Sequence, residues 1–224
     1  MRQPTREANL DKRAFGQHRQ HRVHGKDTTE TRQDTPAHAK KIWRAGTMLS
    51  PVPPVLLSCG GTAEYPANIV TVAWTGTVCS EPPMLSFSLR PTRHSHGIIE
   101  ATRECVVNLA TASLSRVVDW CGVKSGRDFD KFKEMHLTAL PSSTIRAPMI
   151  GECPVNIECK VRKVLHLGSH DMFLAEITAV QVSKDLLDAR GKLRLDKAEL
   201  LAFAHGEYYA LGRRLGYFGF SVRK

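Results

Sequence analysis

The chain has 224 residues, an apolar share of 42% and a formal net charge of +10. These values are ordinary for a globular protein with one core, and no apolar stretch approaches the roughly 20 residues of a membrane-spanning helix. The N-terminus lacks the apolar segment of a secretory signal. We therefore expect a cytoplasmic protein with reduced thiols and no membrane partner.

The positive charge is unevenly distributed along the chain. Residues 1–41 contain ten Lys or Arg and five Asp or Glu, so half of the net charge lies in less than a fifth of the sequence. This segment has few large apolar side chains and cannot bury enough surface to offset the entropy lost on ordering. We expect a disordered basic tail over residues 1–41 and one folded domain over residues 42–224.

The first half of the domain is expected to contain three strands and a helix. The three apolar, β-branched or aromatic segments expected to be strands are Val55–Cys59, Asn68–Thr75 and Met84–Arg90. In the third, Leu85, Phe87 and Leu89 alternate with polar residues, which indicates one buried face. A helix is expected within Thr92–Glu104, with Ser95 at or near its N-cap.

The second half continues the β pattern. A strand is expected at Cys105–Leu109, short helices and loops from Ser113 to about Met135, and two long strands at Val155–Leu167 and Met172–Ser183 around a turn at 168–171. Residues 155–162 alternate apolar and polar with a period of two. Many strands without regular βαβ alternation favour a mainly β fold, a closed antiparallel barrel with inserted helices.

The sequence lacks the common nucleotide-binding and hydrolase motifs. No GxGxxG follows a strand, and there is neither a GxxxxGK[ST] loop nor a GxSxG elbow. An anion site is instead indicated where Arg90 and Arg93 precede the expected helix, because helix N-termini and guanidinium groups bind phosphate. The same two arginines are equally consistent with a solvated loop cluster.

Residues 47–224 resemble the flavin reductase (flavoredoxin-like) family of FMN-binding split-barrel proteins. The blocks that carry the resemblance are PVPPVLLSCGG, NIVTVAWTGTVCSEPPMLSFSLRPTRHSHGIIEATRECVVNLA, DWCGVKSGRDFDKF, APMIGECPVNIECKV, GSHDMFLAEI and YYALGRRLGYFGF. Their order and the combination of AWTG, CSEPP and SLR make the resemblance specific. It implies an antiparallel Greek-key split barrel of six strands, a homodimer, and one FMN per subunit near the dimer interface.

The resemblance also implies the binding residues. The isoalloxazine ring would be lined by Asn68, Thr71, Ala73, Trp74 and Thr75, although Trp74 would equally suit a core position. The phosphate would be bound by Ser88, Arg90, Arg93, Ser95 and His96, the region where the residues alone predict an anion. Weaker candidates for flavin or nicotinamide contacts are Lys124, Ser125, Gly126 and His170. No catalytic acid or base and no metal ligand is expected.

The implied activity is hydride transfer from NADH or NADPH to the flavin, with the electrons passed to a further acceptor, such as a protein. Two alternatives keep the flavin: an electron-transfer protein reduced by a protein donor, and a flavin-dependent oxidase of another small substrate. A third, of a different class, is a nucleic-acid-binding module that uses the basic tail. We do not favour this one because aromatic residues do not interleave the charges of the tail.

Overall fold

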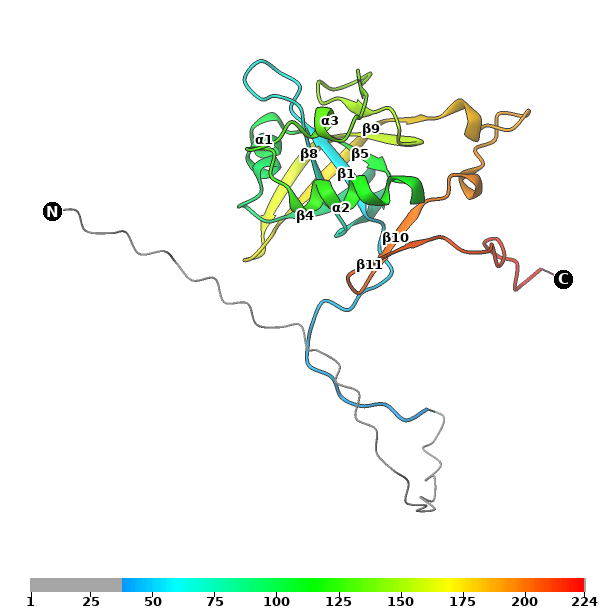
Figure 1. Ribbon diagram of the computed structural model, residues 1–224. Coiled ribbons are helices and arrows are strands. Elements are labelled where there is room, and N and C mark those ends of the chain that lie inside the picture. Colours follow the sequence, from blue (N-terminus) through cyan, green and yellow to red (C-terminus); the bar gives the residue numbers. More distant parts are fainter. Residues whose placement is uncertain (1–37, 224) are drawn as a thin grey trace, which may run out of the picture. The chain divides into compact units, whose positions relative to one another are not determined.

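The computed structural model describes residues 38–223 (Figure 1), and all its helices and strands lie within residues 55–210. Residues 38–45 are exposed and have no regular secondary structure. The expected tail lies mostly outside the described residues, so its disorder and the boundary at residue 42 remain predictions. Between residues 38 and 223, no helix is both long and apolar enough to cross a membrane.

The main sheet has seven antiparallel strands in the order β2-β1-β5-β8-β9-β4-β3. Their bounds are β1 Val55–Cys59, β2 Asn68–Val72, β3 Thr75–Ser80, β4 Pro83–Leu89, β5 Glu104–Leu109, β8 Val155–His166 and β9 Asp171–Val182. β2 and β3 form opposite edges of this sheet, yet only Ala73 and Trp74 separate them along the chain. The edges are thus two halves of one bent strand, which closes the sheet into a barrel.

Counting β2 and β3 as one bent strand gives the six strands that the family resemblance implies. The bend interrupts the expected strand Asn68–Thr75. Within the bend, the carbonyl of Trp74 accepts a hydrogen bond from the N–H of Ser88 in β4, at 2.9 Å. The connections are not simply up and down, since β5 pairs with β1 and β9 pairs with β4. The prediction of a mainly β split barrel is confirmed.

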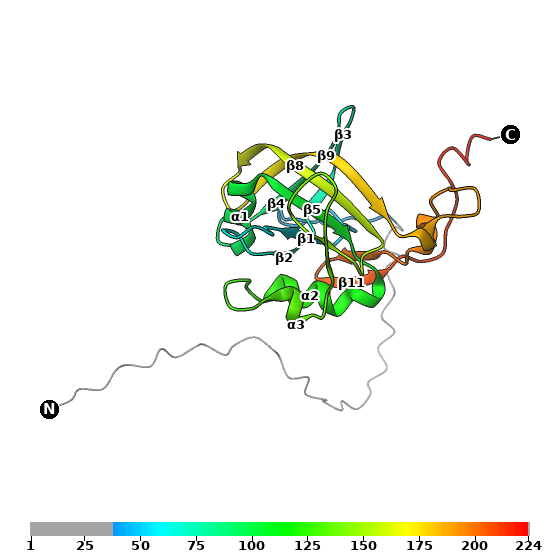
Figure 2. The same cartoon turned by 90° about the horizontal axis from the view of Figure 1, so that it is seen from above.

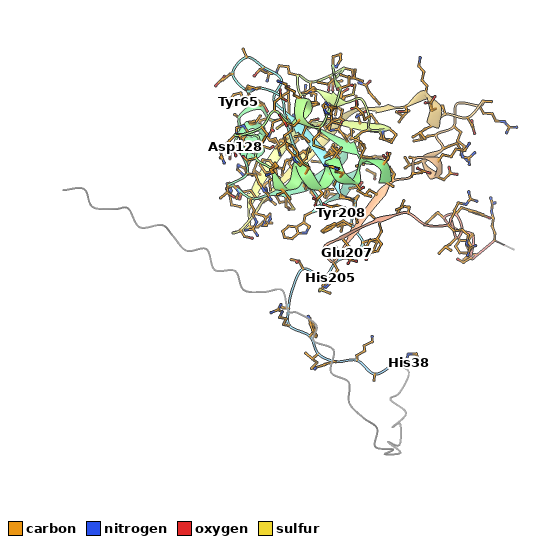
Figure 3. All side chains as sticks on the ribbon, viewed as in Figure 1. His38, Tyr65, Asp128, His205, Glu207 and Tyr208 are labelled. Carbon is orange, nitrogen blue, oxygen red and sulfur yellow. The ribbon has the colours of Figure 1, made fainter. Side chains whose placement is uncertain are left out.

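Helices and short strands surround the barrel. The helices are α1 His94–Thr102, α2 Ser115–Val123 and α3 Lys131–Glu134, with short 3-10 helices η1 Ala112–Leu114, η2 Lys184–Leu186 and η3 Leu195–Lys197. Two small sheets pair β6 Ala139–Leu140 with β7 Met149–Ile150, and β10 Leu201–Ala204 with β11 Glu207–Ala210. Figure 2 shows α2 and α3 outside the barrel beside β1 and β2. The β10–β11 hairpin approaches α2, where the Tyr208 hydroxyl donates to Asp119 Oδ1 at 3.4 Å. Figure 3 labels Tyr208 and Glu207 of this hairpin.

The barrel interior holds the main apolar core. Phe87 of β4 and Phe173 of β9 stack with ring centroids 5.1 Å apart, and both are fully buried. Leu85 and Leu89 are also buried, which confirms the predicted alternation in β4. Ile98 and Ile99 of α1 belong to the same cluster, so this helix is anchored to the barrel core by its apolar face.

The first half of the outer face of β8 is polar in sequence but buried in the structure. Asn156 and Glu158 alternate with apolar residues as predicted, yet their exposed fractions are 8% and 0%. Part of the segment between β6 and β7 covers this face, and Ser143 and Thr144 donate hydrogen bonds from their backbone and hydroxyl groups to the Glu158 carboxylate. The period of two in the sequence predicted which face of β8 each residue lies on. It could not predict that a loop covers part of the polar face.

Candidate functional site

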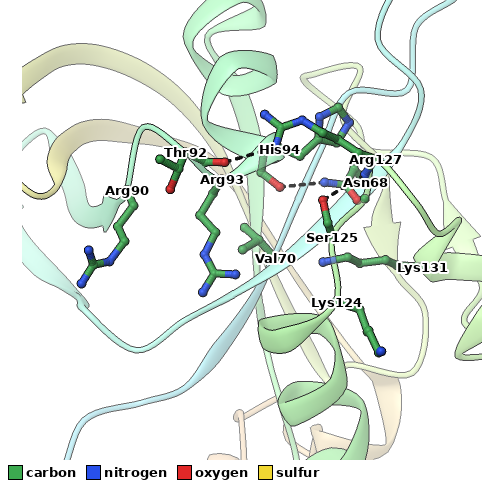
Figure 4. Close-up of a pocket in the computed structure, with 12 residues that line it drawn as sticks. Asn68, Val70, Arg90, Thr92, Arg93, His94, Lys124, Ser125, Arg127 and Lys131 are labelled. Atoms are coloured by element: carbon green, nitrogen blue, oxygen red, sulfur yellow. Dashed lines mark hydrogen bonds between the residues drawn. The ribbon is translucent and has the colours of Figure 1, made fainter. Parts of the chain in front are cut away.

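A cavity of about 350 Å³ lies beside the N-terminus of α1 (Figure 4). Five basic side chains line it: Arg90, Arg93, Lys124, Arg127 and Lys131. No Asp or Glu is among the lining residues that the structure describes. Figure 4 shows Arg93 and Lys131 extending into this space from opposite sides. The cavity therefore has the electrostatic character of an anion site.

The first turn of α1 supplies polar groups to the cavity. Arg93 is the N-cap residue, and the next two residues, His94 and Ser95, line the cavity. The first N–H groups of a helix lack intrahelical acceptors and attract anions. Ser95 is buried, and its hydroxyl accepts a hydrogen bond from Asn68 Nδ2 at 2.8 Å, so β2 fixes its position. Ser95 thus lies near the N-cap, as predicted, without capping the helix through its side chain.

The C-terminal end of α2 holds two of the cations in place. The carbonyl of Cys121 accepts from Lys131 Nζ at 2.7 Å, and that of Gly122 accepts from Arg93 Nη1 at 2.9 Å. These carbonyls belong to the last turn, which lacks intrahelical donors and carries the negative end of the helix dipole. Arg127 Nη1 donates to the carbonyl of Thr92 at 3.3 Å. Three of the five cations are therefore oriented before any ligand arrives.

Lys131 is the most unusual of these cations because its side chain is buried. Its exposed fraction is 3%, and burial lowers the pKa of the ammonium group, which Arg93 lowers further. Within residues 38–223, no carboxylate forms a salt bridge with it. A buried ammonium group with one carbonyl partner is costly, so a bound anion would relieve an unfavourable charge.

A second cavity of about 150 Å³ adjoins the first and shares Arg90 and Arg93 with it. Its other walls include Thr71, Ala73, Trp74, Ser88 and His170. The rings of Trp74 and His170 pack with centroids 4.4 Å apart. Burial, and then the charges of Arg90 and Arg93, lower the pKa of His170, which favours the neutral imidazole.

A third cavity of about 470 Å³ also borders the Ala73–Trp74 bend and shares Ser88 with the second. Met48, Leu49 and Val52 contribute apolar side chains to its lining. Thr75, expected near the flavin ring, lines this cavity, and its hydroxyl donates to the carbonyl of Ser86 at 2.7 Å. The bend therefore borders both a polar cavity and a more apolar one.

The structure brings together nearly all the residues expected to bind a flavin. Those lining the cationic cavity are Asn68, Arg90, Arg93, Ser95, Lys124, Ser125 and Gly126, and those lining the smaller cavity are Thr71, Ala73, Trp74, Ser88, Arg90, Arg93 and His170. His96 lines none of these cavities, because its Nε2 is directed to Asp171 Oδ2 at 2.8 Å. The structure thus gives this imidazole a protein partner, and a phosphate contact of His96 stays a prediction.

Sequence reasoning did not assign a binding role to several lining residues. These are Val70, Thr92, His94, Arg127 and Lys131. The last two follow Lys124-Ser125-Gly126 within the block DWCGVKSGRDFDKF, so the resemblance already covered them. A lysine in a charged segment is usually exposed, and nothing local to residue 131 indicates that α2 buries it.

Comparison with known proteins agrees with this geometry. A family model described as "Flavin reductase like domain" matches residues 48–212. The chain belongs to the flavin reductase like family. An uncharacterized protein of Archaeoglobus fulgidus is 32% identical over 113 residues, which cover 50% of this chain and 64% of that protein. The aligned part thus spans less than two thirds of this relative.

Solved structures of flavin reductase like proteins share the fold. The flavoredoxin of Desulfovibrio vulgaris (Miyazaki F) superposes with a TM-score of 0.76 and 29% identity, over 83% of this chain and all of that one. A protein from Shewanella frigidimarina with a split barrel domain superposes with a TM-score of 0.66 and 21% identity, over 75% and 86% of the two chains. Both matches support the split-barrel assignment.

Proposed function

We propose that this chain is an FMN-binding flavin reductase that uses NADH or NADPH as hydride donor. The observation that carries the proposal is the junction of two cavities at Arg90 and Arg93, one cationic and the other walled by Trp74 and His170. A flavin mononucleotide has the matching composition, with one phosphate at the end of a ribityl chain and a planar ring at the other end.

The cationic cavity fits a phosphate monoester. Such a group carries close to two negative charges and accepts several hydrogen bonds. The first turn of α1 offers N–H groups, while Lys131 and Arg93 offer oriented charged donors. A dianion would also compensate the buried ammonium group of Lys131. These residues would hold the phosphate, with Asn68 keeping Ser95 in position.

The smaller cavity fits the flavin ring. Trp74 offers an aromatic surface, and neutral His170 can donate or accept one hydrogen bond at the ring edge. When bound, the flavin would supply the hydride-accepting chemistry, and the protein would supply position and electrostatics. The chain then needs only to orient the ring and leave one face open to nicotinamide.

We further propose that the working form is a cytoplasmic homodimer that passes its electrons to a separate acceptor. Apolar side chains at and near the third cavity are accessible, with exposed fractions of 88% for Leu49, 45% for Trp74 and 51% for Val78. A second copy that covered this surface would bury apolar area close to the proposed ring site. Light scattering of the purified protein measures the oligomeric state, and a monomer at micromolar concentration would contradict the dimer.

Equilibrium binding and turnover test the proposed function. FMN should bind at least about tenfold more tightly than riboflavin, because charged hydrogen bonds to phosphate are worth about 1.5–3 kcal/mol. Oxidation of NADH or NADPH should require added flavin. Equal affinity for FMN and riboflavin would contradict the phosphate site. Tight FMN binding without oxidation of either nucleotide would favour the electron-transfer alternative.

A further inference from the structure

The carboxylate of Asp171 is held between two imidazoles. Its Oδ2 lies 2.8 Å from His96 Nε2, and its Oδ1 lies 3.0 Å from His166 Nδ1. His96 and Asp171 are each 5% exposed, whereas the side chain of His166 is 73% exposed. The carboxylate therefore has one buried partner and one solvent-exposed partner.

This bridge connects the walls of the two proposed flavin cavities. His96 directly follows Ser95, which lines the cationic cavity, and Asp171 directly follows His170, which lines the smaller one. Asp171 also opposes Leu89 in the β4–β9 ladder. Neither His96 nor Asp171 lines these cavities. Their contact therefore lies behind the binding surfaces and can act on a ligand only by positioning other residues.

The surroundings of His96 restrict its imidazole to this arrangement. Its ring packs edge-on against Phe173 with centroids 5.2 Å apart, and its Nδ1 faces Glu100 of the same helix at 3.8 Å. Hydrogen bonds from His166 and then His96 lower the pKa of Asp171, which keeps the carboxylate ionised. Removing the imidazole of His96 would leave this carboxylate without its buried donor, which is unfavourable.

We propose that His96 is a positioning residue that, through Asp171, fixes the phosphate-binding turn relative to His170. The inference rests on the proposed flavin site. The first turn of α1 and the β8–β9 turn are far apart in sequence, and the His96–Asp171 contact links them by a direct side-chain hydrogen bond. The phosphate ligands on one side and the ring contact on the other are thereby held at one spacing.

Three substitutions test this role in the full-length protein. His96→Ala removes the buried donor, His96→Gln keeps an amide N–H that can reach Asp171, and His166→Ala removes only the exposed donor. By analogy with outer partners of metal ligands, His96→Ala should weaken FMN binding about 10- to 100-fold. It should change riboflavin binding much less. His96→Gln should recover most of the loss, and His166→Ala should change FMN affinity less than about threefold.

Other results would overturn the proposal. FMN affinity unchanged in His96→Ala would show that the bridge does not position the site. An equal loss for FMN and riboflavin, together with a lower melting temperature and no recovery in His96→Gln, would show a role in stability alone. If the wild-type protein binds neither flavin, the proposed function itself fails, which is distinguishable from failure of the bridge.

A further measurement does not depend on flavin. Proton NMR of the ligand-free protein should show a slowly exchanging imidazole N–H of His96, because a buried ring proton bonded to a carboxylate is protected from water. Asp171→Asn should abolish or shift this signal, while His166→Ala should leave it in place. Absence of the signal in the wild-type protein would contradict the buried contact on which the proposal depends.

Discussion

The indole of Trp74 packs against the imidazole of His170, with ring centroids 4.4 Å apart and ring planes tilted by 46°. Trp74 lies at the bend between β2 and β3, and His170 lies in the turn between β8 and β9. Closure of the barrel brings these two turns together. The pair forms a wall of the smaller cavity, so the proposed ring site depends on the same bend that joins the two edges of the sheet.

Replacing Trp74 should affect the ring end of the ligand. Trp74→Ala should weaken FMN and riboflavin by similar factors of about three- to tenfold, because an aromatic contact is worth about 0.5–1.5 kcal/mol. Flavin should also quench the tryptophan fluorescence of the wild-type protein more strongly than that of Trp74→Phe. Trp43→Phe, at a side chain that is 70% exposed, is the control. A loss confined to FMN would place Trp74 near the phosphate instead.

Replacing Lys131 should affect the phosphate end. Lys131→Met should weaken FMN about 10- to 100-fold, from the loss of a charged hydrogen bond, and should leave riboflavin nearly unchanged. The melting temperature of the ligand-free protein should not fall, because the substitution also removes a buried charge whose pKa burial lowers. Lys133→Met, on the exposed side of α3, should change neither quantity. Equal losses for both flavins would contradict the assignment.

Gly126 should tolerate no side chain without disturbing the site. A Cβ there would clash with Asn68 Oδ1, so the amide would have to move away from Ser95. Gly126→Ala should therefore weaken FMN about tenfold, equivalent to one hydrogen bond. Gly97→Ala in α1 has no atom within 4 Å of the added Cβ, so it should keep FMN affinity and raise helix stability slightly. FMN titrations of both variants make this comparison, and unchanged binding in Gly126→Ala would contradict the role of Asn68.

Glu158 should make the stability of the barrel sensitive to acid. Burial alone would raise the pKa of its carboxyl, but hydrogen bonds from Ser143, Thr144 and Gln181 lower it from 4.5 to about 2. Because the folded-state pKa lies below the unfolded-state value, the stabilisation is complete above about pH 4.5 and is lost as the pH falls toward 2.

Glu158→Gln should therefore lower the free energy of unfolding at pH 7 by about 1–3 kcal/mol, the usual worth of hydrogen bonds to a charged group. The difference between the variant and the wild type should shrink as the pH falls below about 4.5. Urea unfolding at several pH values measures both quantities. A difference that stays constant down to the lowest pH at which the protein folds would mean that ionisation of Glu158 does not contribute.

Local patterns were sufficient for the strands but not for closure of the barrel. Alternation in Met84–Arg90 and β-branched content in Asn68–Thr75 are consequences of a half-buried pleated surface, so they were visible in sequence. The bend at Ala73–Trp74 depends on pairing with β4, where the backbone N–H of Ser88 donates a hydrogen bond to the Trp74 carbonyl. Such pairing between distant segments leaves no local periodic signal.

The site was predictable to a similar degree. Arg93 and Ser95 could be placed together from the sequence, because a position before or in the first turn of a helix favours anions, and both line the basic cavity. His96 could not be oriented, since its partner Asp171 is 75 residues away in sequence. In the sequence, Lys131 is one of several charged residues in its segment. Its burial depends on the position of the last turn of α2, whose Cys121 carbonyl accepts its hydrogen bond.

Anaerobic spectroscopy shows whether flavin held by the protein accepts hydride from a nicotinamide nucleotide. Protein mixed with FMN and freed of excess flavin is titrated with NADH and, separately, with NADPH while its visible absorption is recorded. We predict that flavin is retained and that its absorption bleaches with at least one nucleotide. Retained flavin that stays oxidised with both nucleotides would contradict the reductase activity. A protein that neither retains FMN nor couples nucleotide oxidation to added flavin would contradict the proposed site as well.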